Sequence, residues 1–134
     1  MYELKVRSRQ REQLVEITDE VRRKLEESGA REGVCFFYVQ HTTAGLTINE
    51  NADPDVQSDL LHALRTLLPQ HGMNFRHGEE NSDAHIKASI VGASVAVPFS
   101  GGRLLLGRWQ GIFLCEFDGP RERKVIMKIM TSAE

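Results

Sequence analysis

The stretch FFYVQHTTAGLTINENADPD, residues 36–55, carries the clearest fold signal in the chain. It begins with aromatic and β-branched residues, which favour a strand, and then changes abruptly to a histidine, two threonines and a glycine. A second apolar run follows and ends in Asn, Glu and Asp side chains. The pair Asp53-Pro54 is a typical helix start, because the acid caps the helix and proline fits its first turn. The stretch therefore predicts two strands and a helix, with polar clusters that packing alone does not require.

The composition is typical of one ordinary globular domain, which we take to span residues 1–134. Hydrophobic residues make up 40% and charged residues 27% of the chain. The 17 Lys and Arg against 19 Asp and Glu give a net charge of −2, which does not indicate a nucleic-acid partner. No apolar stretch approaches the roughly 20 residues that span a bilayer, and the N-terminus lacks the apolar core of a signal peptide. We therefore expect a cytoplasmic protein with no membrane partner.

Hydrophobic alternation predicts the strands. Residues 2–6 should form a strand, with QLVEI at 13–17 returning as its hairpin partner. The run GVCFFYVQ at 33–40 is apolar on both alternations, which predicts a central strand covered on both faces. The glycines of the turn at 100–102 either serve a hairpin or cradle an anion. Further strands are expected in GLTIN (45–49), ASVAVPF (93–99), RLLLG (103–107), WQGIFLCEF (109–117) and KVIMKIM (124–130).

Three helices are expected between these strands. Thr18 is a candidate N-cap for a helix over residues 19–28, and Ser82 is a candidate N-cap for a helix that continues to residue 91. The third runs from Pro54 until Pro69 ends it. Strands at both ends with helices between them predict an α+β fold: a single compact domain with largely antiparallel sheets and about three helices.

Three histidines are candidates for chemistry. His41 ends the predicted central strand, His77 lies in a polar loop, and His85 falls in the first turn of the last helix. Ser89 lies one turn beyond His85 on the same helix face. A neutral imidazole binds metal ions and accepts protons, but each histidine could equally be a hydrogen-bonded structural residue. The spacing between His77 and His85 matches no established metal motif.

Charged residues of the last strands offer a second candidate group. Glu116 and Asp118 share one strand face, about 7 Å apart, because strand side chains alternate with a period of two. This pair suits a divalent ion, a general acid or base, or salt bridges to Arg121 or Arg123. The nearby cations are either solvated surface charges or groups that neutralise a phosphate ester. They are Lys87, Arg103, Arg108, Arg121 and Arg123.

Three segments resemble the YjbQ-like family. They are QHTTAGLTINENADPD, RHGEENSDAHIKASIVGASVAVP and GGRLLLGRWQGIFLCEFDGPR, in that order, and the similarity covers nearly the whole chain. Arg108 stands before the tryptophan of LGRWQ, where the family more usually has threonine. The resemblance implies a compact α+β domain that assembles as a homotrimer. It also implies secondary thiamine-phosphate synthase activity, which joins a pyrimidine diphosphate to a thiazole phosphate and releases pyrophosphate.

The resemblance also carries polar family positions onto this chain. We predict catalytic roles for His41, His77, His85 and Glu116. Substrate-binding roles are predicted for Thr42, Asn49, Glu50, Asp53, Lys87, Ser89, Arg103 and Gln110. Our hypothesis is that the three histidines converge near Glu116 and bind a divalent metal, zinc or a similar ion. For a diphosphate substrate Mg²⁺ would be expected instead, with Arg103 or Lys87 neutralising its charge.

Three functions therefore follow as alternatives. The first is thiamine-phosphate synthesis from two small phosphorylated metabolites. The second is metal-dependent hydrolysis of a small phosphorylated metabolite by the same histidines. The third is a non-catalytic homotrimer that binds a metabolite or a metal, with its polar residues at subunit contacts.

Overall fold

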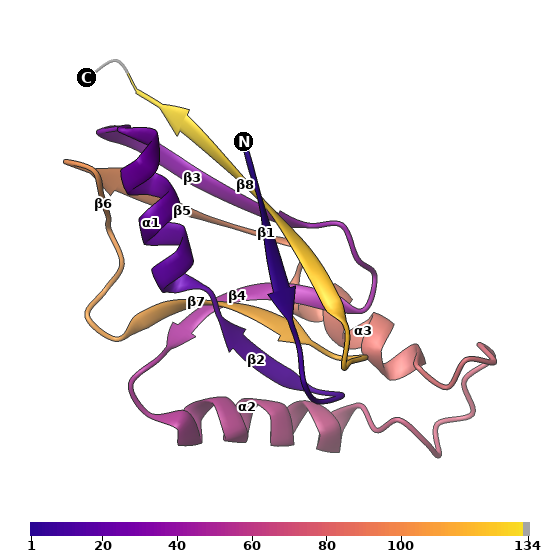
Figure 1. Cartoon of the computed structure of the whole chain (residues 1–134). Helices are drawn as coiled ribbons and strands as arrows, with labels where there is room; N and C mark the ends of the chain where they lie inside the picture. Colours follow the sequence, from indigo (N-terminus) through magenta and orange to yellow (C-terminus); the bar gives the residue numbers. More distant parts are fainter. Residues whose placement is uncertain (133–134) are drawn as a thin grey trace.

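Two antiparallel sheets and three helices make up the computed structural model, which describes residues 1–132 (Figure 1). The strand order is β1-β8-β3-β5-β6 in the larger sheet and β2-β7-β4 in the smaller. All strand pairs in this part of the chain are antiparallel, which confirms the predicted α+β domain. The elements are β1 (Tyr2–Arg7), β2 (Gln13–Glu16), α1 (Thr18–Ser28), β3 (Glu32–Val39), β4 (Ala44–Glu50), α2 (Pro54–Leu67), α3 (Ser82–Val91), β5 (Ser94–Ser100), β6 (Arg103–Leu104), β7 (Gln110–Glu116) and β8 (Glu122–Thr131).

The first two strands do not form the predicted hairpin. β1 pairs with β8 in the larger sheet, whereas β2 pairs with β7 in the smaller sheet. The chain leaves the first sheet at Ser8, whose N–H donates to the carbonyl of Arg121 at 3.0 Å. Shortly afterwards the carbonyl of Arg11 accepts from the N–H of Gly119 at 2.9 Å. The connection therefore bonds to the β7–β8 turn, and the sequence-based prediction of a hairpin is wrong.

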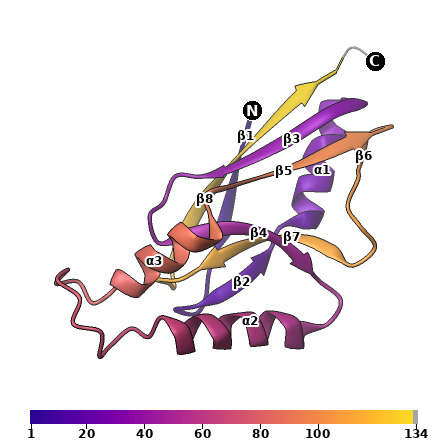
Figure 2. The same cartoon turned by 180° about the vertical axis from the view of Figure 1, so that it is seen from behind.

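Two apolar clusters lie on either side of the smaller sheet. The first lies between the two sheets and includes Val21 and Leu25 of α1. The second lies between the smaller sheet and the helices α2 and α3, which cover its other face (Figures 1 and 2). β7 contributes to both clusters, because Leu114 faces the first and Phe113 and Cys115 face the second. The strand buried on both faces is therefore β7.

The central strand β3 is covered on one face in this chain. Cys35 and Phe37 on its inner face are fully buried, whereas Tyr38 on the outer face is 43% exposed and Phe36 is half-buried. The prediction that both faces of this strand are covered is therefore not met within residues 1–132. Its apolar outer face remains open, since no element within residues 1–132 packs over it.

The predicted N-caps of the helices are confirmed in part. The carboxylate of Asp53 accepts from the N–H of Asp55 at 2.9 Å, which confirms the predicted cap of α2. Thr18 is not a cap but the first residue of α1, and its Oγ1 accepts from the N–H of Ile112 at 2.9 Å. Ser82 is likewise the first residue of α3. The hydroxyl of Thr18 therefore ties α1 to β7.

The two cysteines lie in apolar runs of β3 and β7. Cys35 and Cys115 are free and buried, and burial raises their pKa values to about 11 and about 12. Both side chains are therefore inert thiols of the core. Among residues 1–132 none of the helices has the length and apolar content required to cross a lipid bilayer.

A buried ion pair joins the two sheets at one end. Glu116 of β7 and Arg123 of β8 are both buried, and the guanidinium Nε donates to Glu116 Oε1 at 2.9 Å while Nη2 contacts Oε2. Ser8 Oγ donates to the same carboxylate at 2.7 Å. Burial opposes ionisation of Glu116, but the hydrogen bonds from Arg123 and Ser8 outweigh it and lower the pKa. The sheets are therefore tied by a charged contact whose groups all have partners.

Removing the cation of this pair should destabilise the fold strongly. Arg123→Ala would leave the carboxylate of Glu116 buried without its counter-ion, at a cost of about 3–5 kcal/mol. Arg121→Ala is the matched control, because Arg121 pairs with Asp118 at a half-exposed position and should cost less than about 1 kcal/mol. Urea unfolding measures both. Equal losses for the two variants would show that the buried pair does not hold the sheets together.

Candidate functional site

A cleft lies between the β3–β4 connection and helix α3, which are neighbours in both views (Figures 1 and 2). Its volume is about 490 Å³, and its walls include His41, Thr42, His85 and Ser89. Two further hollows adjoin it, one with His77 and one with residues of the β7–β8 turn. His85 lines all three. We call this region, defined by His41, Thr42, His77, His85 and Ser89, the histidine cleft.

Backbone contacts fix the position of the histidine cleft. The N–H of Leu46 donates to the carbonyl of Gly92, the residue that ends α3, at 3.0 Å. Gly45 permits this approach, since a Cβ there would lie 2.7 Å from the same carbonyl oxygen. Thr43 is held from the other side, because Arg123 Nη2 donates to its Oγ1 at 2.8 Å. The β3–β4 connection is therefore clamped between α3 and the buried ion pair.

Helix α3 presents His85 and Ser89 one turn apart. Ser89 Oγ donates to the carbonyl of His85 at 2.9 Å. The imidazole of His85 packs edge-on against His77, with 5.5 Å between ring centroids. His77 is itself half-exposed, and its Nε2 lies 3.6 Å from Glu79 Oε2. The two rings are therefore neighbours at the open side of the cleft.

The opposite side of α3 carries Lys87, and its environment does not suit the predicted phosphate contact. Lys87 is 1% exposed, and its Nζ donates to Asp83 Oδ2 and Glu12 Oε2, both at 2.7 Å. Arg11 also pairs with Asp83, at 3.0 Å. Burial opposes ionisation of Asp83, but hydrogen bonds from Arg11 and Lys87 lower its pKa. Lys87 is therefore a structural charge inside the protein, away from any solvent-borne ligand.

His41 is a neutral imidazole with one nitrogen in use. Its Nε2 accepts from the backbone N–H of Lys124 at 3.1 Å, which leaves Nδ1 as the N–H donor. Burial lowers the pKa of His41, and the charge of Arg123 lowers it further. His41 is therefore a fixed wall of the cleft rather than a free base.

The three predicted metal ligands do not meet at one point. His77 and His85 are neighbours, but Nε2 of His41 is bonded to the backbone, and Glu116 is bonded to Arg123 and Ser8. Within residues 1–132 no group of three or more His, Cys, Asp and Glu side chains is placed to hold a metal ion. A zinc centre needs three or four such ligands, so the donor set of one chain does not fit the hypothesis.

The other predicted substrate-binding residues lie elsewhere. β4 begins at Ala44 beside the cleft and ends at Glu50, and six steps of about 3.4 Å separate these ends by about 20 Å. Gln110 pairs with Glu50 at that far end, and its Oε1 accepts from the N–H of Gly107 at 2.8 Å. Arg103 lies on β6, also far from α3 (Figure 1). The residues that the structure separates from the histidine cleft are Asn49, Glu50, Asp53, Arg103 and Gln110.

One polar residue of the site lacked a sequence prediction. Asn81 lines the hollow shared by Thr42, His85 and Asp118. It is 9% exposed, and its Nδ2 donates to Asp118 Oδ2 at 2.8 Å, while its Oδ1 is buried with no partner among residues 1–132. A buried polar atom without a partner costs about 1–3 kcal/mol, so it requires explanation. Asn81 could have been found in the sequence by its position, directly before Ser82 and Asp83 at the start of α3.

Comparisons with known proteins give one consistent family. The family model described as UPF0047 protein YjbQ-like matches residues 2–132. UPF0047 protein MJ1081 of Methanocaldococcus jannaschii is 48% identical over 130 residues, which cover 97% of this chain and 94% of the relative. UPF0047 protein YugU of Bacillus subtilis is 48% identical over 127 residues, covering 95% and 96%. The similarity therefore extends over nearly the whole of each chain.

Solved structures agree with this result. An uncharacterised YjbQ/UPF0047 protein of Clostridium acetobutylicum superposes with a TM-score of 0.94 at 46% identity, covering 97% of this chain and 100% of that one. A protein of unknown function from Sulfolobus solfataricus gives a TM-score of 0.92 at 33% identity, with coverage of 98% and 96%. The fold is therefore shared with crystal structures over nearly the whole chain.

Acid should destabilise the protein partly through His41. Its pKa in the folded state lies below the ordinary value of 6.5, so the unfolded chain takes up the proton more readily as the pH falls. The stability contributed by neutral His41 is complete above about pH 6.5 and is lost as the pH falls below that value. We expect the melting temperature of His41→Gln to fall less than that of the wild type between about pH 7 and about pH 5.

Differential scanning fluorimetry across this range is the measurement. His62→Gln, at an exposed position of α2, is the matched control and should follow the wild type. Parallel curves for His41→Gln and the wild type would contradict the assignment of this acid sensitivity to His41.

Proposed function

The chain belongs to the UPF0047 YjbQ-like family, and we propose that it is an enzyme that transfers a proton on a small polar metabolite bound in the histidine cleft. One observation carries the proposal: the imidazole of His85 borders three adjoining hollows, shared with His41, His77 and Asn81. An acid–base catalyst must reach the substrate from a fixed element, and α3 supplies that element. Imidazole, amide and carboxylate side chains line the same hollows as this ring.

His85 and His41 differ in the hydrogen bonds that their ring nitrogens already form. The ring nitrogens of His85 form no hydrogen bond within residues 1–132, so they are available to a substrate. His41 already accepts a backbone N–H at Nε2, and its Nδ1–H is a donor. We therefore assign proton transfer to His85 and substrate positioning to His41.

The hollow beside Asn81 favours a substrate that donates hydrogen bonds. Asn81 Oδ1 lacks a donor among the described residues, and the carboxylates of Asp118 and Glu79 line the same hollow. The two carboxylates are acceptors that match an amine or a hydroxyl group of a ligand, whereas Asn81 Oδ1 is itself buried behind this wall. The substrate of the proposal accordingly carries such a group next to the position that exchanges a proton with His85.

Thiamine-phosphate synthesis is the specific reaction to test first, on the strength of the family resemblance. In that reaction the thiazole nitrogen forms a C–N bond while the C–O bond to the diphosphate breaks, and the electron pair leaves with the diphosphate oxygen. In our proposal a proton from His85 assists this departure. An amino group on the pyrimidine would find the acceptors around Asn81. Metal-dependent hydrolysis ranks below this function, since the chain offers only the His77–His85 pair as neighbouring imidazoles among its described residues.

Replacing His85 should reduce turnover without unfolding the protein. With both thiamine precursors and Mg²⁺, we expect wild-type protein to form thiamine phosphate and His85→Gln to lower kcat about 10²–10⁴-fold with little change in KM. The exposed His62→Gln is the control and should retain activity. The measurement is chromatographic detection of thiamine phosphate.

Two results would count against parts of the proposal. Full activity of His85→Gln would remove this residue from the chemistry. No turnover by the wild type would remove the synthase reaction. If the wild type showed no turnover but small amines stabilised it thermally, the non-catalytic binding alternative would be favoured.

We also propose that the chain assembles as a homotrimer through the outer face of the larger sheet. The resemblance implies this state, and the apolar outer face of β3 supports it, because Tyr38 of this face and Met130 of the neighbouring β8 are 43% and 44% exposed. An apolar patch of this kind is typical of a subunit contact. In this proposal other copies of the same chain cover the outer face of the larger sheet.

A charge placed on this face should separate the subunits. By light scattering we expect the wild type at about three times 15.2 kDa and Tyr38→Glu near one chain mass. Leu67→Glu, at an exposed position of α2, is the control and should keep the wild-type mass. A wild type at 15.2 kDa, or an unchanged mass for Tyr38→Glu, would contradict the assignment.

A further inference from the structure

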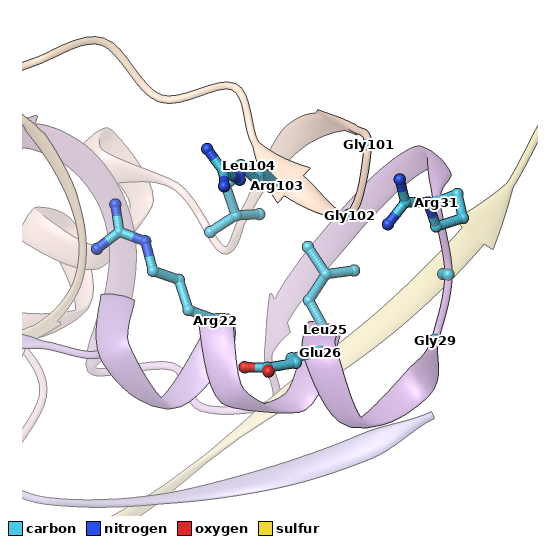
Figure 3. A pocket seen from close by; sticks show the side chains of 10 residues that line it. Arg22, Leu25, Glu26, Gly29, Arg31, Gly101, Gly102, Arg103 and Leu104 are labelled. Carbon is cyan, nitrogen blue, oxygen red and sulfur yellow. The ribbon is translucent and has the colours of Figure 1, made fainter.

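A larger cavity lies far from the histidine cleft, between the C-terminal half of α1 and the β5–β6 hairpin (Figures 1 and 3). Its volume is about 650 Å³. Arginines from three segments line it: Arg22 of α1, Arg31 after that helix, and Arg103 of β6. Figure 3 shows Arg22 and Arg103 on one side and Arg31 on the other, with Leu25 between them. We call it the arginine cavity.

The charge of the arginine cavity contrasts with the charge of the whole chain. Its three arginines and one acid, Glu26, give a local charge of +2, whereas the chain carries −2. Arg31 and Arg103 form no ion pair within residues 1–132, and Arg22 approaches Asp19 at 3.6 Å in an exposed contact. Guanidinium groups without carboxylate partners favour an anion, and their planar donors match phosphate oxygens.

The hairpin turn fixes the arginines but does not itself hold an anion. Gly101 and Gly102 have φ values of 59° and 76°, a left-handed conformation that glycine adopts without strain. The N–H of Gly101 donates to Glu32 Oε1 at 3.1 Å, and the N–H of Gly102 donates to the carbonyl of Arg31 at 3.0 Å. Both amides are therefore in use, which confirms the hairpin role of these glycines. The second bond also holds Arg31 beside the hairpin that carries Arg103.

We propose that the arginine cavity binds a small phosphorylated metabolite at a site separate from the histidine cleft. The guanidinium groups of Arg31 and Arg103 contact the phosphate, with Arg22 completing the charge. Leu25 and Leu104 provide an apolar wall, which suits the carbon skeleton of a metabolite better than inorganic phosphate alone. The arginines of this cavity belong to a chain whose net charge is −2, which favours a small ligand over a nucleic acid.

Calorimetric titration of the intact protein with phenyl phosphate tests the proposal. This probe combines a phosphate with an apolar ring. The controls are phenol, which lacks the phosphate, and inorganic phosphate, which lacks the ring. We expect phenyl phosphate to bind with a Kd in the range of about 10 μM to about 1 mM, more tightly than either half. The double variant Arg31→Ala/Arg103→Ala should weaken binding at least about 10-fold. Raising the salt from about 50 to about 200 mM should weaken it as well.

Two controls distinguish this site from the proposed active site. Arg23→Ala removes a neighbouring exposed arginine of α1 that does not line the cavity, and it should bind phenyl phosphate like the wild type. His85→Gln should also bind it normally. Absence of binding up to about 10 mM, or equal binding by the double variant and the wild type, overturns the proposal. Loss of binding in His85→Gln alone would place the phosphate in the histidine cleft and refute a separate arginine site.

Discussion

The buried contact between Glu116 and Arg123 is the constraint on which the arrangement of the molecule depends. It connects the last residue of β7 in one sheet to β8 in the other, across a turn that also bonds to Ser8. The same guanidinium reaches Thr43, so the connection that carries His41 is held by the contact that joins the sheets. Because a buried charge without its counter-ion is costly, neither partner can move independently. Fold and site geometry are therefore fixed by one set of bonds.

Local patterns in the sequence predicted the elements, but not all of their partners. The cap at Asp53, the turn glycines and the antiparallel strands follow from short-range chemistry, and all are present. The pairing of β1 with β8 could not be read from a short connection, because it depends on the bonds of Ser8 to a turn more than 100 residues away. Burial was likewise misassigned: β3 and β7 have similar apolar runs, but α2 and α3 cover only the sheet that contains β7.

The sequence predicted which site residues lie together only where those residues belong to the same helix or strand. Helical spacing put His85 and Ser89 on one face, and both line the cleft. Asn49, Glu50 and Asp53 were assigned to substrate binding together with Thr42, but β4 has seven residues and its two ends lie about 20 Å apart. Lys87 shows a further limit, since its burial depends on acids from two different segments. Spacing along the chain therefore identified residue types and faces, whereas proximity required the tertiary structure.

The charges of the two candidate sites argue for a division of labour. The hollow beside Asn81 contains Glu79, Asp118 and Arg121, a sum of −1 with neutral histidines, whereas the arginine cavity carries +2. A phosphate dianion is repelled by the first environment and attracted by the second, and within low-dielectric walls such differences decide where a ligand binds. The acceptors of the histidine cleft instead suit the donor end of a substrate. A free phosphorylated ligand is therefore best assigned to the arginine cavity, whereas a diphosphate substrate would enter the histidine cleft with Mg²⁺, which neutralises its charge.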